Sequence, residues 1–217
     1  MTREKALTRR QLVAGAIAAG GVVLSRPATA QTVDPSAYFA GSAMDNSMVY
    51  RKTNFAMIQP VWRRQLVKYY SDEPPGTVVV DTNHHFLYLI FENKTALRYG
   101  VGVGLEGFQW FGRAEIDRKA AWPNWVPPPE MLKRRPDLPR FVAGGPDNPL
   151  GPRALYLYRN GTDLGYRIHG TVEPWSIGSD VSSGCIRMFP EDVMDLYQRC
   201  PIGTRVLVLK HIAARGA

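Results

Sequence analysis

The sequence predicts a mostly β fold with one short helix near the C-terminus and long irregular loops. Runs rich in Val, Ile, Phe and Tyr recur between turn residues from position 77 to 210, a pattern typical of strands. The clearest amphipathic helix spacing follows Pro190. With 217 residues, of which 45% are hydrophobic and 21% charged, the chain fits one globular domain plus an extension.

Residues 1–30 have the composition of an export signal. A basic start leads to an apolar run at 12–24, and three small residues at 28–30 supply a cleavage pattern. An arginine pair at 9–10 matches a twin-arginine signal in part, so the twin-arginine and general secretory routes both stay open. The apolar run is too short to span a bilayer comfortably. We therefore expect a mature chain that begins at Gln31, has no integral membrane segment and lies in the periplasm or cell wall.

The net charge of +8 does not indicate a nucleic-acid partner. Residues 1–30 hold five basic residues and one acidic residue, a net +4, and the remainder holds 22 basic and 18 acidic residues, also +4. No dense Lys/Arg cluster remains after the signal. The modest positive charge would favour approach to an anionic polymer such as a cell wall.

Residues 31–76 form an N-terminal extension in this interpretation. They lack clear strand alternation, and residues 60–70 have the apolar spacing of a short helix. The turn-rich stretch at 71–76 ends that element. We expect the extension to pack against the following domain.

Residues 77–210 are expected to form the catalytic domain, with 211–217 as a C-terminal tail. Pro190 suits the first turn of the short helix, and its apolar face includes Val193 and Leu196. Strand-like segments occur at 78–80, 86–91, 97–103, 113–119, 154–158, 166–169 and 204–210.

Two loops interrupt the strand pattern. The glycine-rich run at 102–107 is not a phosphate-binding loop, because no Lys-Ser/Thr pair ends it and no helix pattern follows. It is expected to be a bend or a rim where backbone approaches a ligand. Residues 122–153 make a long connection that is stiffened by four prolines between Trp122 and Glu130. A connection of that length inside a domain is usually a lid or binding loop.

The residues that can carry chemistry gather between 168 and 188. Cys185 and Arg187 are two positions apart, so on an extended strand they point to the same face. His169 precedes Cys185 by sixteen positions, a spacing that fits two neighbouring strands joined by a loop. A thiol beside an imidazole that can take its proton is the minimum equipment for thiolate acyl transfer. Cys185 is therefore the candidate nucleophile and His169 the candidate proton donor and acceptor.

The neighbouring residues suggest supporting roles. Gly184 leaves a backbone N–H unobstructed beside the sulfur, as an oxyanion hole requires. Arg187 would favour the thiolate or bind a substrate carboxylate. The carbonyl of Gly170 is a candidate for orienting the imidazole, and the role of Ser183 as a hydrogen-bond partner stays open.

The other cysteine and histidine side chains are expected to have structural and not catalytic roles. Cys200 ends the predicted helix, where we expect a buried thiol rather than a disulfide with Cys185. His84 and His85 are expected to be solvated in a turn. No spacing of His, Cys, Asp and Glu resembles a zinc site, so no metal and no cofactor are expected.

The residues at the centre of this pattern resemble a known signature. Ile-His-Gly-Thr at 168–171, followed by Ser-Ser-Gly-Cys-Ile-Arg-Met at 182–188, is similar to the signature of the YkuD-type L,D-transpeptidases of bacterial cell walls. Many family members have histidine where this chain has Ser183, which leaves His169 as the single imidazole of the motif. The similarity covers about 77–210 and includes the segments at 78–81, 102–104, 122–125 and 173–178.

The resemblance implies a β-sandwich domain and a defined reaction. Cys185 would attack the carbonyl of the L-to-D peptide bond after the third residue of a peptidoglycan stem tetrapeptide, and terminal D-alanine would leave. An amine of a second stem peptide, or of a lipoprotein, would resolve the thioester. The resemblance further implies roles in cell-wall biogenesis and cell shape and sensitivity to carbapenems. Two alternatives stay open: an L,D-carboxypeptidase or cross-link hydrolase that uses water, and a non-catalytic cell-wall-binding protein.

Overall fold

The structure is a computed structural model that describes residues 34–105 and 110–210. The expected export signal at 1–30 and the expected tail at 211–217 thus fall outside the described residues. Strands dominate the described part, with two α-helices, α1 (Pro129–Arg134) and α2 (Pro190–Arg199). The mostly β prediction is confirmed, and α2 is the short helix expected near the C-terminus.

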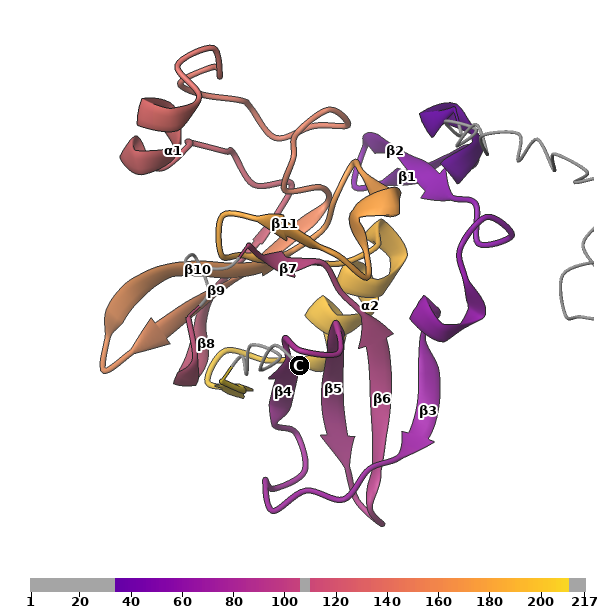
Figure 1. Cartoon of the computed structure of the whole chain (residues 1–217), viewed down its shortest axis with the longest axis vertical. Helices are drawn as coiled ribbons and strands as arrows, with labels where there is room; N and C mark the ends of the chain where they lie inside the picture. Colours follow the sequence, from indigo (N-terminus) through magenta and orange to yellow (C-terminus); the bar gives the residue numbers. More distant parts are fainter. Residues whose placement is uncertain (1–33, 106–109, 211–217) are drawn as a thin grey trace, which may run out of the picture. The chain divides into compact units, whose positions relative to one another are not determined.

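The largest sheet among the described residues has nine strands (Figure 1). In spatial order these are β12 (Ile186–Arg187), β10 (Thr162–His169), β9 (Arg153–Arg159), β8 (Gly112–Ala121), β13 (Arg205–Val208), β4 (Val78–Asp81), β5 (Phe86–Phe91), β6 (Thr95–Gly100) and β3 (Gln65–Lys68). Two neighbouring pairs are parallel, β12 with β10 and β13 with β4, and the other pairs are antiparallel. The parallel pair β10–β12 brings together the two halves of the motif.

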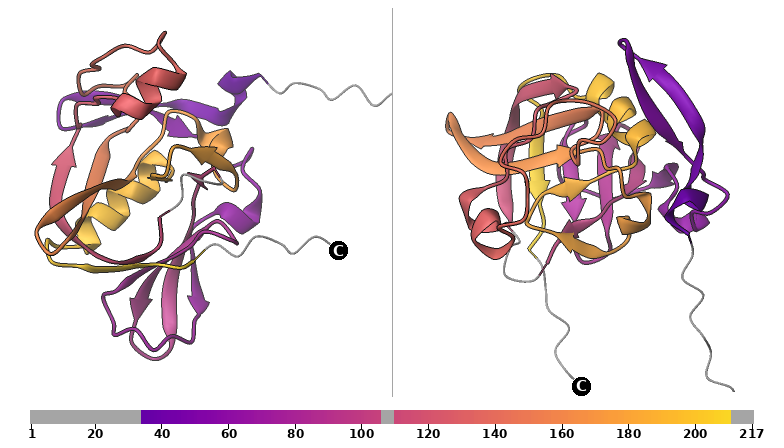
Figure 2. Two further views of the ribbon diagram at one scale, coloured as in Figure 1. Left: turned by 60° about the vertical axis from the view of Figure 1, so that its left-hand side comes forward. Right: turned by 90° about the horizontal axis from the view of Figure 1, so that it is seen from above.

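One hydrophobic core lies between α2 and strands from both ends of this sheet. Ile168 on β10 and Leu157 on β9 are fully buried in the same cluster as Val193 and Leu196 of α2. α2 begins at Pro190, which suits a first helical turn because its fixed φ is already helical. Figure 2 shows α2 lying against the sheet. Residues on β10 and β12 that alternate with the core side chains therefore face away from α2.

A tight turn joins the two strands of the hairpin that carries His169. β9 and β10 are joined at Asn160 and Gly161, whose φ angles are +50° and +74°. Two consecutive residues with positive φ form the type of turn that matches the twist of antiparallel strands, and Asn-Gly is the favoured pair. The turn sets the pairing at the start of the hairpin, and an irregularity between positions 163 and 167 then shifts the register, so that His169 lies opposite Ala154.

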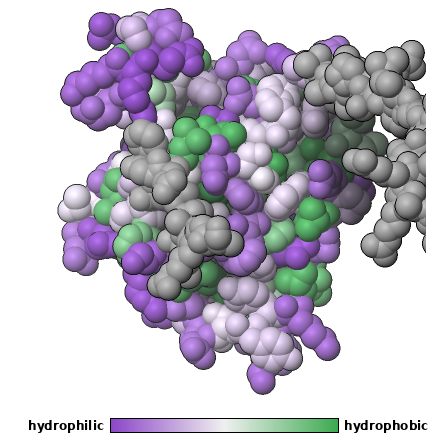
Figure 3. Space-filling model, in the orientation of Figure 1, coloured by the Kyte–Doolittle hydropathy of each residue, from purple (hydrophilic) through white to green (hydrophobic). Residues whose placement is uncertain are grey.

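The shorter elements are arranged around this sheet. β7 (Val103–Gly104) pairs in parallel with β11 (Asp180–Ser182), and β1 (Phe39–Asp45) forms a hairpin with β2 (Met48–Thr53). Single 3₁₀ turns occupy Pro35–Tyr38, Pro60–Trp62 and Pro174–Ser176. None of the helices in the described ranges is long and apolar enough to cross a membrane. On the face drawn in Figure 3, apolar side chains form small groups separated by polar ones.

The helix predicted for residues 60–70 is wrong. Only Pro60–Trp62 makes a helical turn, and Gln65–Lys68 is the edge strand β3, which pairs with β6. The apolar residues that suggested a helical face do not share a buried side, because Leu66 is 67% exposed and Tyr70 is 74% exposed. Backbone pairing with β6, which the local sequence does not reveal, decides the conformation. The extension therefore adds a strand to the nine-stranded sheet.

The β1–β2 hairpin is anchored to the domain by Asp45. Its carboxylate accepts two hydrogen bonds from Arg153, at 2.6 and 2.8 Å, and one from the indole N–H of Trp122 at 2.9 Å. The Arg153 hydrogen bond lowers the pKa of Asp45. The backbone N–H of Thr53 donates to Glu191 at the start of α2. Trp122 thus helps to hold the hairpin against the nine-stranded sheet.

A buried carboxyl group near this anchor makes stability depend on pH. Asp192 is 1% exposed, and its Oδ2 atom has no hydrogen-bond partner within the described ranges. Burial raises its pKa from 3.8 to about 7, although Arg64 lies 3.7 Å away. The folded state keeps the proton up to about pH 7, while the unfolded chain releases it near pH 4. Stability from this group is therefore present at pH 4 and lost as pH rises through 7.

The variant Asp192→Asn should unfold at a higher temperature than wild type at pH 8. The amide stays neutral, so the cost of a buried charge, about 3 kcal/mol, disappears. We expect the melting temperature to rise by roughly 5 °C or more at pH 8 and to change little at pH 4. Thermal unfolding at both pH values measures this. An equal or lower melting temperature at pH 8 would contradict the assignment.

Candidate active site

The parallel pairing of β10 with β12 gathers the candidate residues on one sheet face. Ile168 lies opposite Ile186 and His169 opposite Arg187. Continuing this register by one residue sets Cys185 beside Arg167. Because Ile168 and Ile186 are buried in the core, the four alternating side chains, those of Cys185, Arg187, Arg167 and His169, face the opposite side.

His169 is held in one tautomer by the backbone. Its ring is 5% exposed, and Nδ1 lies 2.5 Å from the carbonyl oxygen of Gly170. Because a carbonyl only accepts, Nδ1 must carry the proton, and Nε2 is left as the basic nitrogen. Burial, reinforced by the charge of Arg187, lowers the pKa of His169 to about 3. The imidazole is therefore neutral and able to accept a proton at physiological pH.

Gly170 also has a steric reason to be glycine. A Cβ atom there would lie 2.8 Å from the Pro152 ring and 3.2 Å from the Leu150 carbonyl oxygen. A larger residue would push the carbonyl away from the His169 ring. The carbonyl that the sequence suggested as the partner of the imidazole is thus the one in contact with it.

The Cys185 thiol is neutral in the resting structure. The side chain is half-buried, and burial raises its pKa. A hydrogen bond from the Arg167 backbone and the charges of Arg167 and Arg187 act in the opposite direction but do not outweigh it. The thiol and the imidazole on this sheet face are thus both neutral, so a thiolate at Cys185 would have to form by proton transfer.

Ser182 fixes the shape of the loop at 182–185 that carries Cys185. Its Oγ atom accepts a hydrogen bond from the Gly184 N–H at 3.1 Å and donates to the Cys185 carbonyl at 2.5 Å. Gly184 has a φ of +114°, which residues with a side chain rarely adopt. The Gly184 N–H is engaged with Ser182 and is not the unobstructed donor that the sequence suggested. Ser182 itself was missed, although its place in the motif could have drawn attention to it.

Arg187 has a carboxylate partner within the chain. One terminal nitrogen donates to Glu173 at 2.6 Å, and both side chains are partly exposed. The sequence proposed that Arg187 favours the thiolate or binds a substrate carboxylate. The charge of Arg187 lowers the pKa of Cys185, in agreement with a role in favouring the thiolate. As for binding a substrate carboxylate, Glu173 already competes with any incoming anion.

The long connection 122–153 reaches the loop at 182–185 through α1. Arg134, the last residue of α1, donates to the exposed Ser183 hydroxyl at 3.3 Å. The side-chain amide of Asn148 holds the base of the connection by donating to the carbonyl oxygens of Pro123, Val142 and Ala143. Ser183 thus contacts the connection, as expected if the connection acts as a lid.

The glycine-rich segment supports the site from the other side. Gly102 and Arg187 exchange two backbone hydrogen bonds, at 3.0 and 2.8 Å, and Leu105 donates to the Ser182 carbonyl. A Cβ atom on Gly102 would lie 2.7 Å from the Ser176 carbonyl oxygen. At Gly102 the close approach that glycine permits is to the Ser176 carbonyl of the chain itself.

The remaining histidines and the second cysteine differ in how well they were predicted. His85 is only partly exposed, and its Nε2 atom lies 3.0 Å from Asp180 at the start of β11. His84 is largely exposed and contacts Asp81. Both cysteines are free thiols, as predicted, and burial raises the pKa of Cys200 to about 12. Within the described ranges, no group of three or more His, Cys, Asp or Glu side chains could hold a metal ion.

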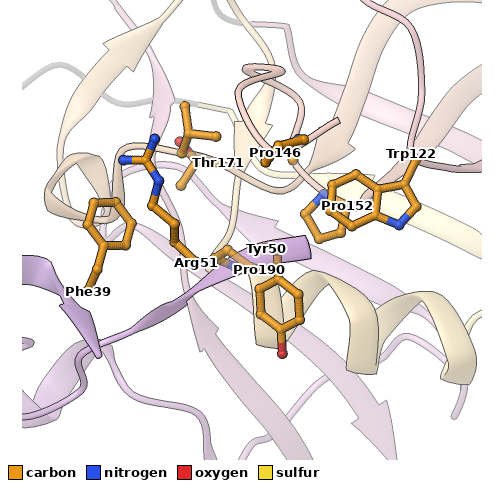
Figure 4. Close-up of a pocket in the computed structure, with 10 residues that line it drawn as sticks. Phe39, Tyr50, Arg51, Trp122, Pro146, Pro152, Thr171 and Pro190 are labelled. Atoms are coloured by element: carbon orange, nitrogen blue, oxygen red, sulfur yellow. The ribbon is translucent and has the colours of Figure 1, made fainter. Parts of the chain in front are cut away.

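A small cavity lies at the junction of the hairpin and the domain (Figure 4). Its volume of about 20 Å³ suits one water molecule. Arg51 crosses it between the Phe39 ring and Asp147. We interpret it as a gap in an anchoring interface. Its lining residues are Phe39, Tyr50, Arg51, Trp122, Pro146, Gly151, Pro152, Thr171, Val172 and Pro190.

Comparison with known proteins decides the family. The family model of the YkuD L,D-transpeptidase catalytic domain matches residues 75–208, more than half of the chain. The chain belongs to the YkuD family. Its fold, with the mostly β architecture and the β10–β12 motif, is accordingly of the YkuD type.

Several named proteins are similar to this YkuD-family chain. The Bacillus subtilis putative L,D-transpeptidase YqjB is 35% identical over 71% of this chain and 81% of its own length. The Escherichia coli probable L,D-transpeptidase ErfK/SrfK is 36% identical over 62% of this chain but only 44% of its own length. A solved Brucella melitensis chain, described as a probable carnitine operon oxidoreductase, is 48% identical with a TM-score of 0.48 and covers 72% of this chain and 99% of its own. The first curated relatives are thus about twice as long as the region they share with this chain.

Proposed function

We propose that this chain is an exported L,D-transpeptidase that acts on peptidoglycan stem peptides through a thioester on Cys185. The observation that carries the proposal is the β10–β12 pairing, in which a neutral imidazole tied to the Gly170 carbonyl shares a sheet face with the thiol. Membership of the YkuD family supports the same reaction class. The periplasm or cell wall is the compartment in which this substrate occurs.

The first half-reaction forms the acyl-enzyme. Nε2 of His169 takes the Cys185 proton, and the sulfur attacks the carbonyl carbon of the L-to-D bond after the third stem residue. The C–N bond then breaks, and the proton on Nε2 passes to the departing D-alanine nitrogen. Because the Gly184 N–H is bound to Ser182, the main-chain N–H of Cys185 is our candidate donor to the oxyanion.

The second half-reaction releases the acyl group. An amine of a second stem peptide attacks the thioester and gives a proton to His169, which returns it to the leaving sulfur. A lipoprotein amine would undergo the same step. Water as acceptor would make the protein an L,D-carboxypeptidase or cross-link hydrolase. The contact of Arg134 with Ser183 favours transfer, because a lid over the loop at 182–185 would limit the access of water.

Mass spectrometry of muropeptides incubated with the protein tests the proposal. Cross-linked dimers that lack one D-alanine support transfer. Monomers shortened by D-alanine, without dimers, would replace transfer by hydrolysis. Unchanged muropeptides that still bind the protein would leave a cell-wall-binding function and overturn the enzymatic proposal.

A carbapenem should acylate Cys185 and not Cys200. The strained β-lactam carbonyl imitates the acyl donor, and the Cys185 side chain is half-buried whereas Cys200 is buried in the core. Intact-protein and peptide mass spectrometry should find one adduct, on the peptide that contains Cys185. Cys200 serves as an internal control, and an adduct there alone would contradict the site assignment.

A further inference from the structure

A row of aligned side chains extends from the nucleophile across the sheet. Arg167 on β10 lies opposite Tyr156 on β9, and Tyr156 lies opposite Arg118 on β8. Cys185 lies beside Arg167 at the other end of the row, by the register of β10 and β12. Residues adjacent to the row, including Leu155 and Leu157, are in the core, so the row lies on the face turned away from α2.

The centre of the row is a tyrosine ring clamped by two guanidinium groups. The Cζ atom of Arg118 is 3.7 Å from the centroid of the Tyr156 ring, and that of Arg167 is 4.7 Å away. Tyr156 is only 5% exposed beneath them. Stacking on an aromatic face orders a guanidinium while its edge N–H groups stay available for hydrogen bonds. Arg118 is therefore held in place before any ligand arrives.

The charges on this face leave one arginine for a ligand. Arg167 is occupied by Asp163, which accepts from both terminal nitrogens at 3.2 and 3.1 Å. Arg187 is bonded to Glu173. Arg118 is exposed, and among the residues that the structure describes no carboxylate lies within ion-pair distance of it. A preordered, exposed and unneutralised guanidinium is suited to bidentate binding of a carboxylate.

The distance from the thiol to Arg118 matches the length of a short peptide. Cys185 and Arg118 are three strand spacings apart, about 14 Å between backbones. Four extended residues span about 13 Å. An acyl donor that lies across β10 and β9, with its scissile carbonyl at Cys185, would bring residues two to four positions away into reach of the Arg118 side chain.

We propose that Arg118 binds a carboxylate of the acyl-donor peptide and selects acidic donors over amidated ones. This inference rests on the proposed function, since it takes a stem peptide as the donor. Arg118 makes no contact with the thiol or imidazole in this scheme, so it acts in substrate selection and not in the chemical steps. Arg167 stacks on the Tyr156 ring, on which Arg118 also stacks, and so helps to hold that ring in place.

The test compares Arg118→Gln with wild type on two stem tetrapeptides, one with free side-chain and α-carboxylates and one with these amidated. The matched control is Lys68→Gln, which removes an exposed positive charge from β3 at the far edge of the same sheet. We expect Arg118→Gln to raise KM for the acidic donor roughly tenfold or more while kcat is unchanged. KM of Arg118→Gln for the amidated donor should stay the same. KM of Lys68→Gln should stay the same for both donors.

Two results would overturn the inference: unchanged KM of the Arg118→Gln variant for the acidic donor, or equal losses on both donors. Titration calorimetry of the acidic tetrapeptide into Cys185→Ala separates this inference from the proposed function. If wild type shows no turnover, the proposed function fails. Weaker binding after Arg118→Gln is added to Cys185→Ala would still support the carboxylate site, and unchanged binding would exclude it.

Discussion

Replacing Cys185 with alanine should abolish turnover and leave the fold intact. Without the sulfur no thioester can form, and the loss should be at least about a thousandfold in kcat. Ser182 keeps the loop in shape, because its hydrogen bonds go to the Gly184 amide and the Cys185 backbone carbonyl, both of which remain in the variant. The measurement is muropeptide turnover together with thermal unfolding.

The matched control is Cys200→Ala. Cys200 is buried in the core at the end of α2, so its truncation should lower stability by about 1–2 kcal/mol and leave kcat near wild type. Each variant removes one thiol. A loss of turnover in Cys185→Ala alone would therefore come from the chemistry at that thiol and not from a change in folding. Activity retained by Cys185→Ala would refute the nucleophile assignment, and so would the opposite pattern in the two variants.

Much of the sheet and the motif could be predicted because their signals are local. Runs such as Val78–Asp81 and Phe86–Phe91 are rich in β-branched and aromatic residues, and Pro190 marks the start of α2. The spacing of His169 and Cys185 was enough to suggest neighbouring strands. The carbonyl of Gly170 could be proposed because it is adjacent in sequence to the His169 ring that it contacts.

The remainder depended on contacts between residues far apart in the chain. The edge strand β3 owes its conformation to β6, about thirty positions later, which no helical spacing at 60–70 could indicate. His85 was expected in solvent, but its partner Asp180 is 95 positions away. Likewise, Arg118 and Arg167 share the Tyr156 ring only because β8, β9 and β10 are neighbours in the sheet.

Replacing His169 with asparagine should slow turnover by a factor of about 10² to 10⁴. Asparagine offers an N–H near the position of Nδ1 and can keep the hydrogen bond to the Gly170 carbonyl, but it has no counterpart of the basic Nε2 atom. The variant therefore removes proton transfer while preserving the local contact. An exposed histidine provides the control, since His84→Gln should leave kcat unchanged.

The same variant should also change how stability depends on pH. In wild type the folded state keeps His169 neutral down to about pH 3, whereas the unfolded chain takes up the proton near pH 6.5. Stability from this group is thus present above pH 6.5 and lost as pH falls toward 3, on the order of 2 kcal/mol between pH 7 and 4.5. Asp192 acts with the opposite sign over much of this range, because acid favours its protonated folded form.

The comparison must therefore be between variants. Urea unfolding at pH 7 and 4.5 should show that acid lowers the free energy of unfolding less for His169→Asn than for wild type or His84→Gln. Equal losses in all three proteins would mean that burial does not lower the pKa of His169, because the folded state would then take up a proton at pH 4.5 as readily as the unfolded chain.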